Sequence, residues 1–454
     1  MTFRRIFAAL IAAALMILLS SCGKNKDEAA PEDNNGKKIV KLYGWNLSKD
    51  LKEQISIFNR RSTEHNIVIT DYLIAHPSDP LIQLNIDIVS GNLPDILVIQ
   101  TGMNLPVDSY ISKGLFADIY DYIDNDPDVD RSDFAESVFR AYEVDGKLYE
   151  AAPTFNIYTL TAKTSLAGEK QGWTMDEFID FVDSHPDKRI FREYQSKDSV
   201  LGRFIRYGYN EYIDRDTGEC HFDSDEFIRL LEFCDRFPKE VDHSYLDDPD
   251  WVTKDDFDLL NGNIIFEDQF IYRFDNIRMF EHGYFGEPVT FKGYPGTGGN
   301  GSVIYTDCLF SVSSKSDNAD GAWEFIKYLL SEEYQDQYST SNAYDFPVRL
   351  SSLEKQAEAC KERPYRNVGN GEKEYNDKVV YIGTNEIIIG ENTDEDNRRI
   401  FDLINSSESA YGNNYYITNI VINEAAAYFE GQKSAKEVSE IIQNRVSNYI
   451  AENR

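Results

Sequence analysis

The sequence predicts an α/β protein of two lobes, each a mostly parallel sheet flanked by helices. Strand-like and helix-like segments alternate from residue 39 onward, which is typical of βαβ units. The chain has 454 residues, more than one hydrophobic core usually organises, so two lobes are expected. Hydrophobic residues make up 41% and charged residues 28%, a composition that indicates a globular rather than a disordered chain.

The first elements follow one another closely after the N-terminal segment. Hydrophobic periodicity predicts strands at residues 39–43, 67–73 and 96–99, and helices at 49–61 and 81–90. This order of strands and helices predicts a parallel arrangement, because each helix returns the chain to the start of the next strand.

Later helices are marked by their N-terminal residues. Thr174 with Glu177, and Ser434 with Glu437, form the capping-box spacing that predicts a helix start. Residues 321–330 carry apolar side chains at helical spacing and predict a further helix.

The N-terminus predicts export and lipid anchoring. Arg4 and Arg5 precede an unbroken apolar run at 6–19, which is shorter than a membrane-spanning helix needs and is typical of a signal peptide. The sequence Leu-Ser-Ser-Cys that ends at Cys22 resembles a bacterial lipobox. That resemblance implies a signal peptide at 1–21, cleavage before a lipidated Cys22, and a polar, flexible tether at 22–37. The protein is therefore expected at the extracellular face of the cell membrane.

Composition and motifs exclude several classes of function. The formal net charge of −33 gives no basic patch for nucleic acid. No CxxC pair occurs, and the six histidines lack metal-ligand spacing, so neither a metal nor a cofactor is expected. Residues 296–301 match GxGxxG, but strand-like residues follow where a dinucleotide site needs a helix. The acidic stretches at 124–135 and 214–225 lack the glycine and glutamate of a calcium loop. No catalytic constellation is found.

Five stretches, taken in order, carry a resemblance to a known family. They lie at 86–96, which contains Ser-Gly-Asn-Leu-Pro-Asp-Ile, and at 110–119, 145–149, 172–178 and 313–330. Together with the lipobox they resemble the extracellular solute-binding proteins of family 1, the maltose-binding-protein-like group. The resemblance covers roughly residues 38–450.

The resemblance implies the periplasmic-binding-protein-like fold, with the ligand in a cleft between two lobes that close about a hinge. Chain crossings are expected near Pro153, near 295–301 and near Pro347, where proline and glycine suit turns. The first lobe would comprise 38–153 plus 297–346, and the second 154–296 plus 347–454.

Candidate ligand-binding residues follow from aromatic content and from position. The 29 tyrosines and 27 phenylalanines offer faces for stacking against sugar rings, although most are expected to fill the two cores. Ligands of parallel sheets sit beyond the carboxyl ends of strands, or near the crossings between lobes. On these grounds the predicted ligand-binding residues are Trp45, Asn46, Thr101, Asn156, Trp251, Glu267, Tyr272 and Gly298.

The resemblance implies a monomeric, lipid-anchored binding protein that captures a carbohydrate, most simply an oligosaccharide, for the permease subunits of an ABC importer. Two alternatives stay open at this point. One is an exported hydrolase acting on polysaccharide, which would need two positioned carboxylates. The other is a lipoprotein that presents its ligand to a sensor system.

Overall fold

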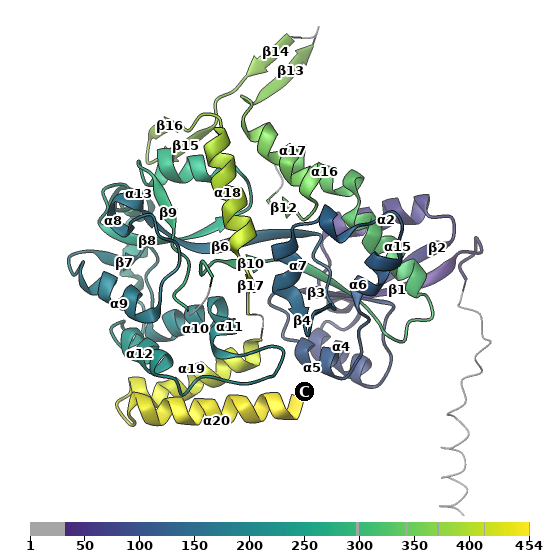
Figure 1. Ribbon diagram of the computed structural model, residues 1–454, viewed down its shortest axis with the longest axis horizontal. Helices are drawn as coiled ribbons and strands as arrows, with labels where there is room; N and C mark the ends of the chain where they lie inside the picture. Colours follow the sequence, from purple (N-terminus) through teal and green to yellow (C-terminus); the bar gives the residue numbers. More distant parts are fainter. Residues whose placement is uncertain (1–31, 297–298, 341–343, 370–371, 413, 454) are drawn as a thin grey trace, which may run out of the picture.

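The computed structural model describes residues 32–296, 299–340, 344–369, 372–412 and 414–453, which form two lobes side by side (Figure 1). The predicted signal peptide, Cys22 and most of the tether lie outside these residues, as does Gly298. Among the described helices, none is long and apolar enough to cross a membrane.

The first lobe is built on a four-stranded sheet in the order β11-β3-β1-β2. β1 runs parallel to both β2 and β3, and β11 pairs antiparallel with β3, so this sheet is mostly parallel as predicted. The strands are β1 (Lys38–Gly44), β2 (His65–Asp71), β3 (Ile96–Gln100) and β11 (Cys308–Val312), with a small hairpin of β4 (Glu143–Val144) and β5 (Lys147–Leu148).

The three helices predicted for the first lobe form as α2 (Lys49–Arg61), α4 (Pro80–Val89) and α15 (Ala319–Leu330). The lobe also contains α3 (Tyr72–Ala75), α5 (Val107–Ser112), α6 (Ile119–Asn125), η1 (Arg131–Asp133), α7 (Glu136–Tyr142) and α16 (Glu332–Thr340), for which no prediction was made. One predicted boundary is wrong: the strand expected at 67–73 ends at Asp71. The Asp71 side chain accepts a hydrogen bond from the Leu73 backbone N–H and so starts α3.

The second lobe has a mixed sheet, which corrects the prediction of a mostly parallel one. Its central strand β6 (Thr154–Lys163) is antiparallel to β8 (Ile264–Ile271), β9 (Val289–Phe291), β10 (Val303–Tyr305) and β12 (Phe346–Pro347). Only β7 (Arg189–Phe191) with β8, and β17 (Ser409–Ala410) with β10, are parallel. The cause is topological, because β6 leads the chain away from the first lobe and β10 leads it back.

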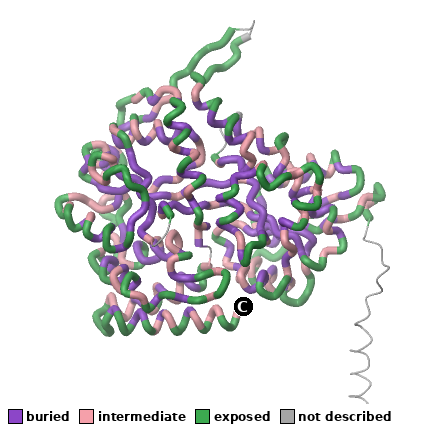
Figure 2. The backbone as a smooth tube through the Cα atoms, in the orientation of Figure 1, coloured by how far each residue is buried: buried purple, intermediate pink, exposed green. Residues whose placement is uncertain are grey.

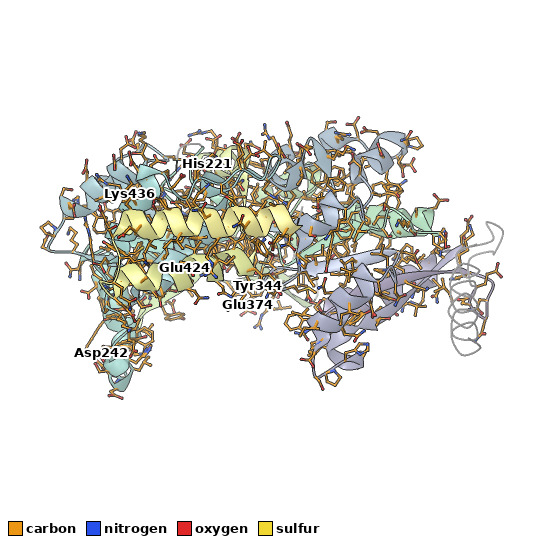
Figure 3. The ribbon with its side chains drawn as sticks, turned by 90° about the horizontal axis from the view of Figure 1, so that it is seen from below. His221, Asp242, Tyr344, Glu374, Glu424 and Lys436 are labelled. Carbon is orange, nitrogen blue, oxygen red and sulfur yellow. The ribbon has the colours of Figure 1, made fainter. Side chains whose placement is uncertain are left out.

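The helices of the second lobe cover both faces of this sheet (Figure 1). Both predicted capping boxes form, at the start of α9 and at the start of α20. The helices are α8 (Thr164–Ala167), α9 (Met175–Asp183), α10 (Lys197–Tyr207), α11 (Tyr209–Tyr212), α12 (Asp225–Cys234), η2 (His243–Asp247), α13 (Trp251–Leu260), α14 (Asn276–Arg278), η3 (Met279–Tyr284), α18 (Asp394–Ser406), α19 (Tyr415–Phe429) and α20 (Ala435–Asn453). α19 and α20 pack side by side along one end of the lobe (Figure 3).

Two hairpins and one helix stand at the end of the molecule opposite α20 (Figure 1). They are α17 (Leu350–Cys360), the hairpin of β13 (Tyr365–Gly369) and β14 (Glu372–Tyr375), and the hairpin of β15 (Val379–Ile382) and β16 (Asn385–Ile388). The β13–β14 hairpin projects from the body, and its described residues are exposed (Figure 2).

Three segments carry the chain between the two sheets. Ala151 bridges Phe310 in the first sheet, and β6 begins three residues later at Thr154. The return passage lies between β10 and β11, after the loop at 295–301. The third lies at β12, which pairs with the first residues of β6.

Buried residues run through both lobes (Figure 2), and the hydrophobic ones form two clusters. One fills the first lobe and continues through the crossing strands. The other lies under the second sheet, where Phe178, Phe204, Phe233 and Phe266 pack against one another. The first core also takes in second-lobe residues such as Ile271, Phe291 and Leu403, so it joins the two lobes. The half-buried residues between the lobes form the natural place for a ligand.

Candidate functional site

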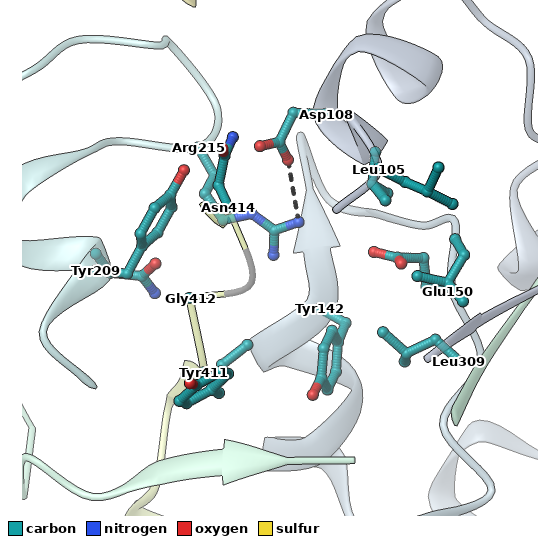
Figure 4. Close-up of a pocket in the computed structure, with 14 residues that line it drawn as sticks. Leu105, Asp108, Tyr142, Glu150, Tyr209, Arg215, Leu309, Tyr411, Gly412 and Asn414 are labelled. Carbon is teal, nitrogen blue, oxygen red and sulfur yellow. Dashed lines mark ion pairs between the residues drawn. The ribbon is translucent and has the colours of Figure 1, made fainter. Parts of the chain in front are cut away.

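A pocket lies between the two lobes, and both lobes contribute to its walls (Figure 4). The first lobe supplies the start of α5, the end of α7 and the segment before the first crossing. The second supplies α11, the loop after it, and the residues between β17 and α19. The pocket is lined by Ile99, Leu105, Val107, Asp108, Tyr142, Glu150, Tyr209, Asn210, Arg215, Leu309, Ala410, Tyr411, Gly412 and Asn414.

Arg215 extends from the second lobe toward the first across this pocket (Figure 4). Its guanidinium lies 3.6 Å from the Asp108 carboxylate and donates a hydrogen bond of 3.4 Å to the Ala141 carbonyl. Beside it, the Asp145 backbone N–H of the first lobe donates to the Asp216 carboxylate at 2.8 Å. These polar contacts join the lobes independently of the three crossing segments.

Glu150 is a buried carboxyl on the first-lobe side of the pocket, with 4% of its surface exposed. Burial raises its pKa to about 7, against the opposing effect of the Arg215 charge and with a smaller contribution from Asp108. Near neutral pH the group is therefore partly protonated, and a carboxylic acid both donates and accepts hydrogen bonds. Such a group suits a ligand hydroxyl better than an ionic partner.

Gly412 allows the second-lobe wall to close up against Tyr209. A Cβ atom at Gly412 would lie 2.7 Å from the Cβ of Tyr209, which is closer than side-chain contacts permit. The Gly412 backbone N–H donates to the Arg206 carbonyl at 2.8 Å, which fixes the turn that leads into α19. Asn414 then caps α19 through its side chain.

A cluster of aromatic rings adjoins the pocket on one face of the second sheet. Strand pairing places Tyr158 opposite Phe270 and Asn156 opposite Tyr305, and alternation puts all four side chains on the same face. The Tyr158 ring lies 4.8 Å from Phe270 and 5.3 Å from Tyr305, centroid to centroid. Tyr411, which lines the pocket, lies 5.5 Å from Tyr305, so the cluster and the pocket are continuous.

Asn156 has a hydrogen-bonding atom without a protein partner among the described residues. It is fully buried, and its Nδ2 donates to Asp345 at 2.6 Å while its Oδ1 accepts nothing. Burial raises the pKa of Asp345 to about 6. Trp45 Nε1 and Gln100 Oε1 in the first lobe are likewise buried and unpaired within the described chain. A ligand rich in hydroxyl groups would satisfy such atoms.

Three of the predicted ligand-binding residues lie together at the carboxyl ends of first-lobe strands. Trp45 follows β1 and packs partly against the first core. Asn46 is exposed, and its backbone carbonyl accepts a hydrogen bond of 3.3 Å from Gln100. The Thr101 hydroxyl donates to the Thr306 carbonyl, at the passage back to the first lobe.

The other predicted residues are more scattered. Tyr272 joins the aromatic cluster, 5.8 Å from Phe270, while Trp251 contacts Tyr245 at 5.1 Å in a separate group of rings. Glu267 lies 3.3 Å from Arg192, and burial raises its pKa to about 7.

None of the described residues predicted from the sequence is among those that line the interlobe pocket. Sequence reasoning missed Asp108, Glu150, Tyr209, Arg215 and Tyr411, which come from five separate segments. Only one pocket residue could have been noticed from a local pattern. Asn414 directly precedes an apolar helical segment, which is the position of a capping residue.

No group of His, Cys, Asp or Glu side chains within the described ranges could hold a metal ion. The acidic residues of the two calcium-like stretches have other partners. Asp124 pairs with Arg131, and Asp126 accepts hydrogen bonds from Trp323 and Lys327. Asp214 accepts from backbone N–H groups of its own turn.

Comparison with known proteins shows which families and structures share this architecture. The sequence profile of a family described as bacterial extracellular solute-binding protein matches residues 83–364. No curated protein matches the chain in sequence.

Solved structures share the fold at low sequence identity. The sugar-binding protein MalE from Xanthomonas citri has 14% identity and a TM-score of 0.58, covering 91% of this chain and 98% of its own. A binding protein for cyclic α-maltosyl-1,6-maltose from Arthrobacter globiformis has 13% identity and a TM-score of 0.54, covering 92% and 100%. An ABC substrate-binding protein from Listeria monocytogenes, in complex with cycloalternan, has 16% identity and a TM-score of 0.52, covering 91% and 99%.

Proposed function

Because the chain belongs to the bacterial extracellular solute-binding proteins, we propose that it captures an oligosaccharide between its lobes for an ABC-type importer. The observation that carries the proposal is the interlobe pocket, whose walls come from both lobes and continue into a cluster of aromatic rings. Rings offer stacking faces, and Asn156, Asn414 and partly protonated Glu150 offer hydrogen bonds to hydroxyl groups. The sugar ligands of structural relatives support the same class of ligand by analogy.

The proposed mechanism is lobe closure about the three crossing segments. The proposed lobes comprise 38–153 plus 297–346, and 154–296 plus 347–454. Within 297–346, β10 pairs with β6 and so belongs to the second sheet, because the return passage lies between β10 and β11. A ligand that touches both walls favours the closed form because it binds that form more tightly. Arg215 would stabilise the closed form through its contacts with Asp108 and Ala141, with or without a ligand.

We further propose that the protein is a monomer held at the extracellular face of the cell membrane by lipid on Cys22. The lipobox-like sequence and the polar tether after it support this anchoring. Cys22→Ser should release the protein from the membrane fraction. Continued retention of that variant by washed membranes would contradict a lipid anchor.

The first experiment is a thermal-shift screen of the protein without its signal peptide against mono- and oligosaccharides, amino acids and peptides. One saccharide class should raise the melting temperature, since ligand at a hundred times Kd stabilises by about 2.7 kcal/mol. Tyr411→Ala should reduce this rise in melting temperature. Tyr381→Ala, which changes an exposed side chain on β15, should leave the rise unchanged. A shift with peptides alone would contradict the saccharide proposal.

The same sugar should then be recovered unchanged by chromatography. Asp108 and Glu150 place two carboxyl groups in one pocket, and cleavage of the sugar would favour the hydrolase alternative. Uptake of the labelled sugar should fall when the gene is deleted. Normal uptake with loss of sugar-induced gene expression would favour presentation to a sensor system. Alanine at Trp45 or Trp251 without loss of affinity would remove that residue from the proposed site.

A further inference from the structure

The first lobe carries an exposed aliphatic surface on α3 and α4, and none of its residues lines the interlobe pocket. On α4, Ile82, Ile86 and Val89 are 62%, 49% and 61% exposed, and Ile74 on α3 is 72% exposed. The spacing of three and four residues puts the α4 side chains on one helix face, and α3 packs against α4. These four residues, with partly exposed Leu73, are called the α4 patch below.

The α4 helix is apolar on two faces, although its fold needs only one. Leu84 and Ile88 are buried and hold the helix against the first core. Nothing in the folding of the lobe requires large aliphatic residues on the opposite face, where polar residues would be neutral or better. A contiguous exposed aliphatic surface marks an interaction site.

Charge around the α4 patch restricts what covers it. Residues 62–112 contain no Lys or Arg, and two of their acidic residues lie on α4 or at its start: Asp79 is exposed and Asp87 is half-buried. Asp71 and Asp95 are buried, and Asp108 pairs with Arg215 in the pocket. A second copy would bring the same acidic rim into contact with itself, and an anionic lipid surface would repel it. The partner that fits has aliphatic side chains at its centre and basic residues at its rim.

The proposed anchor restricts where that partner is. Ten Cα–Cα steps, across nine intervening residues, separate Cys22 from Glu32, where the described chain begins next to β1 of the first lobe. Fully extended, they reach about 35 Å. The first lobe therefore stays close to the membrane surface, where an integral membrane protein is within its reach.

We propose that the α4 patch is the surface by which the first lobe docks on a membrane protein with an aliphatic, basic-rimmed exterior. The proposal rests on the proposed function, in which a membrane protein receives the ligand. It adds which surface makes that contact and the chemistry of the partner's side.

The test compares two purified lipid-free variants in a Cys22→Ser background. The patch variant is Ile82→Ser, Ile86→Ser and Val89→Ser. The control is Tyr381→Ser and Ile388→Ser, which removes exposed apolar groups from the β15–β16 hairpin instead. Cosedimentation is measured with right-side-out membrane vesicles of the producing bacterium, from a strain that lacks its own copy of the gene.

Saturable binding of the parent protein is expected, weakened by salt, with affinity at least tenfold lower for the patch variant and unchanged for the control. Asp79→Lys should also weaken binding, because α4 makes no capping bond through that side chain. Equal binding by parent and patch variant would overturn the proposal. So would equal binding to protein-free liposomes of the extracted lipids, which would identify a lipid contact. A doubled mass by light scattering that the patch variant loses would identify a second copy.

A thermal-shift measurement with maltotetraose keeps the two proposals separate. An equal shift for parent and patch variant shows that the ligand site is intact, so lost membrane binding reports the docking surface alone. If no saccharide shifts either protein while the patch still governs membrane binding, the ligand proposal fails and the docking proposal stands. If parent and patch variant bind membranes equally, and a saccharide still raises the melting temperature of both, the docking proposal alone is overturned.

Discussion

Glu150→Gln should change the pH dependence of stability in a defined direction. The Glu150 carboxyl has a pKa of about 7 in the folded protein because it is buried, compared with an ordinary value of 4.5. The folded state therefore binds the proton more tightly than the unfolded state does. Between about pH 4.5 and 7 the unfolded chain loses this proton first, so the free energy of unfolding falls as pH rises.

The size of the effect follows from the two pKa values. Their separation corresponds to about 3 kcal/mol, fully present as stability below about pH 4.5 and fully lost above about pH 7. Glutamine keeps the shape and hydrogen-bonding capacity of the protonated acid without titrating. At pH 8 the variant should therefore exceed the wild type in stability by up to about 3 kcal/mol, or about 3 °C in melting temperature.

The assay is a series of thermal melts of wild type and variant from pH 5 to pH 8. Glu267 and Asp345 also have raised pKa values, but both proteins contain them, so the difference between the two curves isolates Glu150. An exposed control, Glu374→Gln, should run parallel to the wild type. Parallel curves for Glu150→Gln would refute the reasoning, because they would mean that burial does not raise the pKa of this carboxyl.

Three further changes test the geometry of the site. Arg215→Ala removes the contacts with Asp108 and Ala141, so the ligand-free protein should open and show a larger radius of gyration in X-ray scattering; an unchanged radius would contradict a role in closure. Asn156→Ala should weaken saccharide binding about tenfold in calorimetry, because one hydrogen bond to the ligand is lost. Unchanged affinity would mean that the ligand binds elsewhere. Gly412→Ala should lower the free energy of unfolding by about 1–3 kcal/mol in denaturant melts, since its Cβ would collide with Tyr209. An unchanged free energy of unfolding would show that the backbone at this position can shift to accept the Cβ.

Local elements were predictable because their causes are local. The helix at 49–61 and the strand at 96–99 follow from apolar periodicity, and the capping boxes at Thr174 and Ser434 involve residues three apart. The end of the second strand was missed because the Asp71 side chain captured a neighbouring N–H and started a helix there. Family membership was also predictable, since ordered short stretches along the chain carry it.

The direction of the strands in the second lobe needed the tertiary structure. Strand propensity at 154–163 and 303–312 says nothing about whether two strands run the same way. The direction is decided by which strand carries the chain out of the first lobe and which brings it back. β6 therefore pairs antiparallel with β10, and the sheet is mixed.

The sequence by itself determined the α/β class and the family, because each depends on residues close together in the chain. Only the tertiary structure decided the composition of the interlobe pocket. Asp108, Glu150, Arg215 and Tyr411 are separated by tens to hundreds of residues, and the packing of two lobes brings them together. The pKa of Glu150 also depends on the tertiary structure, since burial in the folded protein raises it. The physical reason is that a site between lobes is made by long-range contacts, which no local pattern encodes.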